Sequence, residues 1–325
     1  APWLSRFVAS ATPQRVEEIA SALTDLFTGA LENHQTLARE IGCPERVVRT
    51  GQLHVYRDDA ALAKDAGGWR LRERQGVRCE RLDGAGIRAL EPAVSRDYTV
   101  AMFMPDQGAV THPFAYAQAI AEVARQRGVV FVRDRIQALS RDADGWTVQG
   151  EQRGYRSAQV VLAAGVWSAQ LLRPLGLRVP LESQRGYHLH VAAPNLAIGR
   201  PIVFAERKVF AAPMEHGLRI SGTVEFGGLD MPPTMRRTAA LKEAAAQGLP
   251  GLALDAPTAW MGHRPCLPDS LPVLGPVHRH PGLWCAFGHG HLGVTGSVNT
   301  GRWIAEGLGR RKPLETFAPF AVERF

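Results

Sequence analysis

The sequence predicts a mixed α/β protein in which pieces of parallel α/β structure are interleaved with an antiparallel sheet. One observation is a helical stripe of apolar residues over 111–128 that runs into the apolar segment 129–132, the order expected of a βαβ crossover. The second is the run 202–224, where three short apolar segments alternate with turn residues, as in an antiparallel sheet. Because the two patterns alternate along the chain, neither unit is expected to be contiguous in sequence.

The composition is that of an ordinary globular protein of 325 residues. Hydrophobic residues make up 45% and charged residues 21%, which excludes a disordered chain, and no apolar run reaches the ~18 to 20 residues of a membrane span. The net charge is +7, but only 310–312 form a tight basic run, so no nucleic-acid partner is expected. Four cysteines without CxxC spacing favour a reducing cytoplasm over a disulfide framework.

The N-terminal region is predicted to be mostly helical. Thr12 can cap a helix, and apolar residues at helical spacing predict one long helix over 12–41. A strand is predicted over 52–56. The Gly-Ala-Gly run at 84–86 resembles the opening of a dinucleotide-binding turn, but the third glycine is absent, so the better interpretation is the cap of a short helix.

The rest of the chain alternates strands and helices. After the helix of 111–128, buried strands are predicted over 129–132 and 159–165, and a hairpin over 136–139 and 146–148. The predicted C-terminal elements are strands over 202–204, 209–212, 218–224 and 283–287, helices over 235–248 and from the turn at 288–293 to Leu308, and a proline-rich loop over 260–274.

The strongest local signal for a ligand is the segment 288–301, which reads GHGHLGVTGSVNTG. A strand enters this glycine-rich turn and a helix leaves it, so free N–H groups and the positive end of the helix would favour an anionic or electron-rich ligand. A tight turn without a ligand explains the same glycines, and spacing alone does not decide between the two interpretations.

Two further groups of residues could carry chemistry. Arg264 lies among apolar residues and prolines, an environment that suits a guanidinium which binds a carboxylate through two hydrogen bonds. The alternative is an ion pair with Asp269. The second group consists of four histidines in two HxH pairs. They lack an acidic ligand and a fixed helical spacing, so no metal is expected at His278, His280, His289 and His291.

Taken together, these segments resemble the flavin-dependent amino-acid oxidase and dehydrogenase superfamily, the group of the D-amino-acid dehydrogenase small subunit, glycine oxidase and sarcosine oxidase. Several ordered blocks carry the resemblance and make it more specific than any single motif. They are 104–106, 160–168, 218–225, 264–265 with 268, 269 and 272, and 288–295 with Gly301.

The resemblance implies an incomplete Rossmann-like FAD-binding domain, made of 105–180 and 257–325, interleaved with an antiparallel-sheet substrate domain made of 1–104 and 181–256. FAD is the implied cofactor. Its implied contacts are Ile136, Ala163, Ala164, Gly165, Gly288, His289, Gly290, His291, Leu292, Gly293, Val294 and Thr295.

The resemblance also assigns residues to the substrate. Arg264 matches the arginine that pairs with the substrate α-carboxylate, and His291 falls where relatives place a second substrate-facing side chain, often arginine. Tyr187 and His188 would line the pocket, with simple packing as the alternative. Family members begin with a strand, a GxGxxG turn and a helix, which this sequence does not contain. The chain is therefore expected to be an N-terminally truncated form with an incomplete site for the ADP half of FAD.

The implied reaction is hydride transfer from the Cα–H of a D-amino acid to flavin, which gives an imine and then a 2-oxo acid. The implied electron acceptor is oxygen or a quinone, and the implied location is the cytoplasm, with a peripheral contact at the inner membrane face. Three alternatives stay open: a secondary amine or glycine as substrate (D-hydroxyproline, proline or sarcosine), a flavin-free non-catalytic fragment, and a zinc hydrolase that uses the histidines.

Overall fold

The computed structural model describes residues 2–325, and it contains one large sheet and three small ones. The large sheet has eight strands, and all neighbours are antiparallel except β11 and β2, which are parallel. Two separate stretches of sequence supply it, as the interleaved fold class predicts. In sheet order the strands are β14 (Thr258–Cys266), β10 (Glu182–Val191), β13 (Gly217–Phe226), β12 (Val209–Met214), β11 (Ile202–Phe204), β2 (Gln52–Tyr56), β4 (Val100–Met104) and β3 (Glu80–Asp83).

The two faces of this sheet differ because side chains alternate along each strand. Tyr187 and Leu189 of β10, with Ile220 of β13, belong to the largest apolar core, which also contains Leu241 and Ala244 of α9 (Thr238–Gly248). Helix α9 therefore covers one face. The intervening residues of the same strands point to the other face, and Arg264 of β14 lies on that face.

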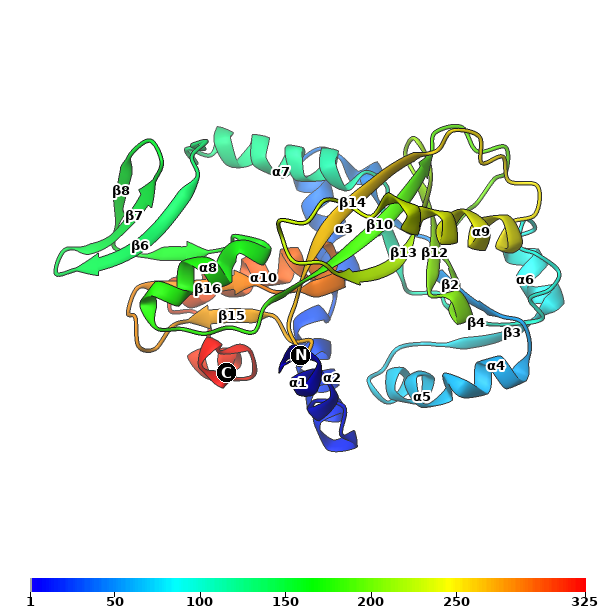
Figure 1. Ribbon diagram of the computed structural model, residues 1–325, viewed down its shortest axis with the longest axis horizontal. Helices are drawn as coiled ribbons and strands as arrows, with labels where there is room; N and C mark the ends of the chain where they lie inside the picture. The colour runs from blue at the N-terminus through cyan, green and yellow to red at the C-terminus, as the bar shows by residue number, and fades with distance from the viewer. Residues whose placement is uncertain (1) are drawn as a thin grey trace.

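The second part of the molecule is built on a three-stranded sheet, in the order β15 (Val273–Pro276), β16 (Leu283–Phe287) and β9 (Val160–Leu162). Strands β9 and β16 are parallel, and helices α8 (Ser168–Leu172) and α10 (Gly293–Leu308) follow them. Figure 1 shows the large sheet at one end of the molecule and this sheet toward the other, with the long strands β10 and β14 reaching between them.

The predicted hairpin is confirmed and gains a third strand. Strands β6 (Ile136–Asp142), β7 (Gly145–Gly150) and β8 (Gly154–Ser157) form a separate antiparallel sheet, which projects from the end of the molecule in Figure 1. Helix α7 (Pro113–Gln126) precedes it and begins with a proline. Proline has no backbone N–H, and it is tolerated here because the N–H groups of the first helical turn have no hydrogen-bond partner within the helix.

The N-terminal region contains helices α1 (Pro2–Ala9), α2 (Pro13–Phe27) and α3 (Ala30–Glu40). The prediction of one helix over 12–41 is wrong, because Gly29 adopts a left-handed conformation with φ 65° and ends the first helix. Asn299 of α10 donates hydrogen bonds to the carbonyls of Leu26 (2.8 Å) and Thr28 (3.0 Å) at this break. A residue distant in sequence thus satisfies carbonyls that the interrupted helix leaves free.

The remaining N-terminal elements are short. Helices α4 (Asp59–Lys64) and α5 (Ala66–Arg74) follow β2, and the small strands β1 (Val47–Arg49) and β5 (Gly108–Val110) pair with each other. The Gly-Ala-Gly run opens α6 (Gly84–Leu90), and Asp83 caps it by accepting a hydrogen bond from the Gly86 N–H at 2.8 Å. The prediction of a helix cap at this position is confirmed.

Two predicted elements are wrong. The run 129–132 is irregular, and Val130 is 83% exposed, because none of the described strands pairs with it. Within the predicted loop over 260–274, residues 260–266 belong to strand β14. Its proline, Pro265, is tolerated because β14 is an edge strand with β10 as its one neighbour in the sheet.

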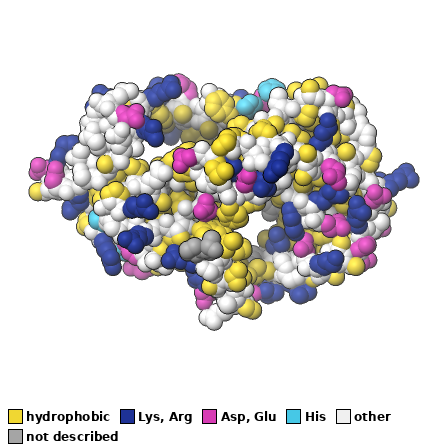
Figure 2. Space-filling view, viewed as in Figure 1, with side chains coloured by type: hydrophobic (Ala, Val, Ile, Leu, Met, Phe, Trp, Pro, Cys, Tyr) yellow, Lys and Arg dark blue, Asp and Glu magenta, His cyan; other side chains and the backbone are white. Residues whose placement is uncertain are grey.

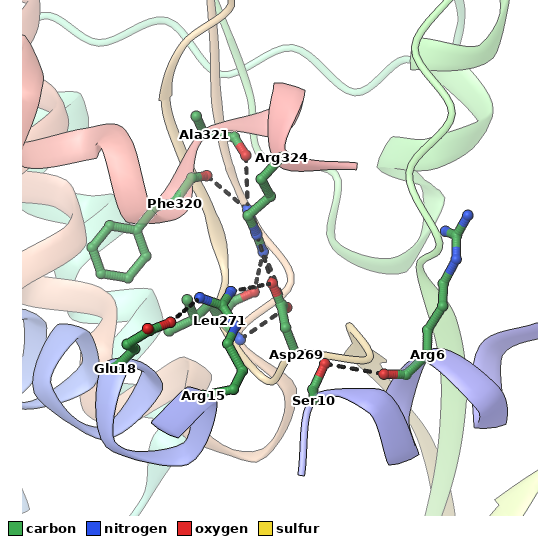
Figure 3. A network of polar contacts seen from close by, with 9 residues as sticks. All are labelled: Arg6, Ser10, Arg15, Glu18, Asp269, Leu271, Phe320, Ala321 and Arg324. Carbon is green, nitrogen blue, oxygen red and sulfur yellow. Dashed lines mark hydrogen bonds and ion pairs between the residues drawn. The ribbon is translucent and has the colours of Figure 1, made fainter. Parts of the chain in front are cut away.

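Asp269 fastens the C-terminal end of the chain to the body of the protein. Arg324 donates to its carboxylate at 2.7 Å, and Arg324 also binds the carbonyl of Leu271 at 2.7 Å. Figure 3 shows Arg15 of α2 approaching the same carboxylate, at 3.8 Å. The alternative that Arg264 pairs with Asp269 is therefore wrong, since Arg324 and Arg15 take this carboxylate.

No helix within residues 2–325 is long and apolar enough to cross a membrane. Figure 2 shows Lys and Arg side chains interspersed with Asp and Glu on the face in view.

Candidate active site

Two glycine-containing loops lie side by side at the carboxyl ends of the parallel strands β9 and β16. Leu162 of β9 is the register partner of Cys285 of β16, so residues 163–165 and the turn at 288–293 leave the same edge of the sheet. In α/β folds this edge is the usual place for a ligand. The sequence predicted both loops, and the structure brings them together.

The backbone of the two loops fits a flat cofactor that approaches closely. Gly165, Gly288 and Gly290 have φ values of 55°, 87° and 54°, which residues with a Cβ rarely adopt. At Gly165 an added Cβ would meet nothing within 4 Å, so space lies open beside that loop. The side-chain hydroxyl of Ser168, just after it, is buried and has no hydrogen-bond partner among the described residues.

Apolar side chains around the loops are exposed. Trp167, Leu292 and Val294 are 52%, 39% and 47% exposed, which is unusual for large apolar residues grouped around glycine turns. These residues, with the N-terminus of α10, would hold FAD: the apolar side chains suit its ring, and the backbone N–H groups suit its electron-rich edge.

Arg264 projects from β14 toward these loops. Its guanidinium lies over Gly186 of the neighbouring strand, so close that a Cβ at residue 186 would lie 2.0 Å from Arg264 Cζ. The guanidinium donates one hydrogen bond, to the carbonyl of Thr223 at 3.2 Å, and forms no ion pair with any residue of the described chain. Burial lowers the pKa of Arg264. A half-buried arginine without a counter-ion is a ready site for a carboxylate.

Arg264 and His291 line one cavity of about 770 Å³. Burial lowers the pKa of His291, and the nearby positive charge of Arg264 lowers it further, so the imidazole is neutral at pH 7. The remaining walls combine small, apolar and basic side chains. They include Lys208, Phe210, Ser221, Thr223 and Leu292.

His289 is directed into the protein rather than toward this cavity. Its Nε2 lies 2.9 Å from the Thr300 hydroxyl, and burial lowers its pKa to about 4. The backbone of His289 still forms part of the turn. Its side chain holds the turn to helix α10.

Tyr187 and His188 lie on opposite faces of β10. Tyr187 is 1% exposed on the core face, where its hydroxyl donates to Glu225 and accepts from the N–H of Thr234. The structure thus does not bring Tyr187 to the Arg264 cavity. His188 is on the same sheet face as Arg264 but lines a separate hollow, and its ring lies 5.1 Å from that of Trp260.

Ile136 begins strand β6 and packs against the same core as Ala164, which places it near the first of the two loops. The four histidines do not form a metal site: no group of metal-binding side chains occurs within the described part of the chain. His280 instead lies 2.9 Å from the carbonyl of Leu175 through Nε2.

Sequence reasoning missed Lys208, Phe210 and Thr223 as cavity residues. Lys208 and Thr223 have φ values of 52° and 54°, a conformation that their residue types do not indicate. Strand β14 carries Arg264 and pairs with β10 in the eight-stranded sheet, although the expected boundary at 257 assigned it to the other unit.

An arginine without an ion-pair partner, beside two glycine loops at the carboxyl edge of a parallel sheet, is an arrangement that suits a dinucleotide and an anionic substrate. The family model "DAO: FAD dependent oxidoreductase" matches residues 4–307. The chain belongs to this FAD-dependent oxidoreductase family, as its resemblance implies, and it is an FAD-dependent enzyme of the amino-acid oxidase and dehydrogenase class.

Two relatives match all or nearly all of the chain. A D-amino-acid oxidase of Bradyrhizobium diazoefficiens is 34% identical over 330 residues, which cover 100% of this chain and 78% of that protein. A D-amino acid dehydrogenase of Dechloromonas aromatica is 30% identical over 338 residues, or 98% of this chain and 78% of that protein. The structure of glycine oxidase from Geobacillus kaustophilus has a TM-score of 0.81 at 22% identity, covering 97% of this chain and 84% of that one, and shares the fold.

Proposed function

We propose that the protein oxidises the Cα–N bond of a D-amino acid, with Arg264 holding the substrate carboxylate. The observation that carries the proposal is the unpaired guanidinium of Arg264, which shares a cavity with His291 beside the two glycine loops. When bound, FAD supplies the hydride acceptor. The imine that leaves the site is hydrolysed to a 2-oxo acid.

Arg264 acts by orientation. Its free N–H groups bind both carboxylate oxygens, and the contact to the Thr223 carbonyl fixes the plane of the guanidinium. A substrate fixed at its carboxylate has its Cα near the loops, and this restriction lowers the entropy cost of reaching the reactive geometry.

His291 binds the substrate amine. Because its pKa is lowered by burial and by Arg264, the imidazole is neutral and accepts a hydrogen bond from the amino group. The loss of hydride from Cα requires an uncharged amine, and burial beside the positive charge of Arg264 disfavours the ammonium form of the substrate.

The names of the relatives support the D configuration: an oxidase and a dehydrogenase of D-amino acids are both at least 30% identical over nearly the whole chain. Val209, Phe210 and Val224 line the cavity and offer contact to an apolar part of the substrate. Secondary amines such as D-hydroxyproline, proline and sarcosine, and the primary amine glycine, remain the second candidate group, and the same assay decides between the groups.

The FAD-loaded protein is tested with D- and L-amino acids, glycine, sarcosine and D-hydroxyproline, by measuring 2-oxo acid or aldehyde formed. Oxygen uptake and quinone reduction are followed in parallel to identify the electron acceptor. Arg264→Gln should raise KM for a D-amino acid by about 10- to 150-fold, because a charge-assisted hydrogen bond contributes about 1.5–3 kcal/mol. Arg279→Gln, an exposed site near the start of β16, is the matched control. An unchanged KM in Arg264→Gln contradicts the role of Arg264.

A further inference from the structure

A second hollow lies on the Arg264 face of the large sheet. Its volume is about 600 Å³, and strands β10, β13 and β14 contribute to it together with the start of α7. The Arg264 guanidinium lies over Gly186 of β10, whereas Arg219 in this second hollow is opposite His190, four residues farther along the strand. At about 3.3 Å per residue the two positions are about 13 Å apart. One small amino acid does not reach both, so this is a separate space, here called the Arg219 hollow.

Two buried nitrogen atoms in the Arg219 hollow lack partners. Arg219 Nε and His190 Nδ1 are inaccessible to solvent and have no hydrogen-bond partner within the described chain. The two residues are cross-strand partners, which places their side chains next to each other on one face. Buried polar atoms in proteins almost always have a partner, so the protein itself leaves the polar groups of Arg219 and His190 incompletely satisfied.

The charge of the hollow is positive and uncompensated. Four histidines and Arg219 line it, and its lining contains no carboxylate. The acidic neighbour Glu215 is engaged elsewhere: its carboxylate is 3.7 Å from Arg46 and 3.5 Å from His216. Arg219 itself forms no ion pair with residues 2–325, and burial lowers its pKa, although a guanidinium stays charged. This environment favours an anion.

The rim of the hollow is aromatic. Trp260 is 58% exposed and Phe114 is 69% exposed, and both line the hollow. The His188 ring lies against Trp260, with the two ring planes inclined at 31°. Burial, and then the charges of Arg219 and His190, lower the pKa of His188 to about 4, so its ring is neutral and serves as part of an apolar wall. Large exposed aromatic side chains around a polar floor are typical of a site for a flat organic molecule.

We propose that the Arg219 hollow binds an organic carboxylate with an aromatic body. The carboxylate contacts Arg219 and His190, and the ring packs against Trp260 and Phe114. This site is distinct from the Arg264 cavity and does not depend on the function proposed for that cavity.

Benzoate is the probe, and calorimetry measures its binding in an Arg264→Gln background, which removes the other carboxylate anchor. We expect one benzoate per chain in Arg264→Gln and at least a tenfold weaker affinity in the Arg264→Gln/Arg219→Gln double variant. The neutral isostere benzamide should bind at least tenfold more weakly than benzoate. Circular dichroism and urea unfolding verify that the variants fold.

If the double variant does not fold, Arg264→Gln/Trp260→Leu replaces it, and we expect at least a threefold loss of benzoate affinity because the aromatic wall is lost.

Three results overturn the proposal. They are loss of benzoate binding on Arg264→Gln alone, equal affinities for benzoate and benzamide, and displacement of benzoate by an equal concentration of inorganic phosphate. The assay measures binding and not turnover. A failure of the proposed binding site is therefore distinguishable from a failure of the proposed amino-acid oxidation.

Discussion

At the scale of single residues, a buried ion pair holds the end of β10 to β13. Arg185 is 1% exposed and donates to Glu225 at 2.6 and 3.0 Å, and Thr234 donates to the other carboxylate oxygen at 2.8 Å. The Tyr187 hydroxyl, then Arg185, Thr234 and Arg237, lower the pKa of Glu225 to about 2 against the opposing effect of burial. This network, absent from any sequence motif, fixes the core face of the strand whose other face supports Arg264.

Glu225→Gln should lower the free energy of unfolding at pH 7 by about 3–5 kcal/mol, because it leaves the buried charge of Arg185 without its partner. The pKa of Glu225 is lower in the folded state than its usual value of 4.5, so its stabilisation is present above that pH and is lost as the pH falls from about 4.5 to about 2. Urea unfolding at pH 7 and pH 3 measures both effects. A difference between wild type and variant that is as large at pH 3 as at pH 7 contradicts this assignment.

At the scale of elements, the site depends on a glycine opposite an arginine on adjacent strands. Gly186 of β10 gives Arg264 the space to lie flat across the sheet. The Gly186→Ala Cβ would overlap the end of a flexible side chain, so we expect Arg264 to move, KM to rise at least tenfold and the free energy of unfolding to change by less than about 1 kcal/mol. Gly67→Ala in α5 has nothing within 4 Å of the added Cβ and is the matched control. An unchanged KM in Gly186→Ala would mean that the position of Arg264 does not matter.

The apolar run 129–132 was predicted to be a buried strand, but the structure shows it exposed and irregular. Four consecutive large apolar residues predict a buried strand, yet all four are at least 46% exposed. Val130→Lys should therefore change the free energy of unfolding by no more than about 0.5 kcal/mol and should reduce self-association, since a charge interrupts an exposed apolar segment. Urea unfolding and analytical ultracentrifugation measure the two quantities. Destabilisation by 2 kcal/mol or more would show that Val130 is buried in solution.

At the scale of the whole molecule, periodicity and turn residues predicted the strand, turn and helix around 283–308, the hairpin of 136–139 and 146–148 and the antiparallel strands within 202–224, because each pattern is local. The features that the sequence did not predict depend on contacts between residues distant in the chain or on the place of a strand in its sheet. Asn299 stabilises the break at Gly29, and β14 is a strand despite Pro265 because it is an edge. The local sequence around Arg264 predicted it as a candidate carboxylate-binding residue. Thr223 and Lys208 were not predicted, because they line the cavity through left-handed backbone conformations that their residue types do not indicate.

We expect the two glycine loops to hold FAD beneath Arg264. The most direct measurement is the visible absorption spectrum of the protein after incubation with FAD and desalting, followed by anaerobic addition of D-amino acids. We expect that the flavin band is retained, that a D-amino acid bleaches it, and that Arg264→Gln retains the band but needs at least tenfold more substrate for bleaching. If the protein retains no flavin, or if no amino acid bleaches a retained band, the two loops and Arg264 do not form the flavin and substrate site.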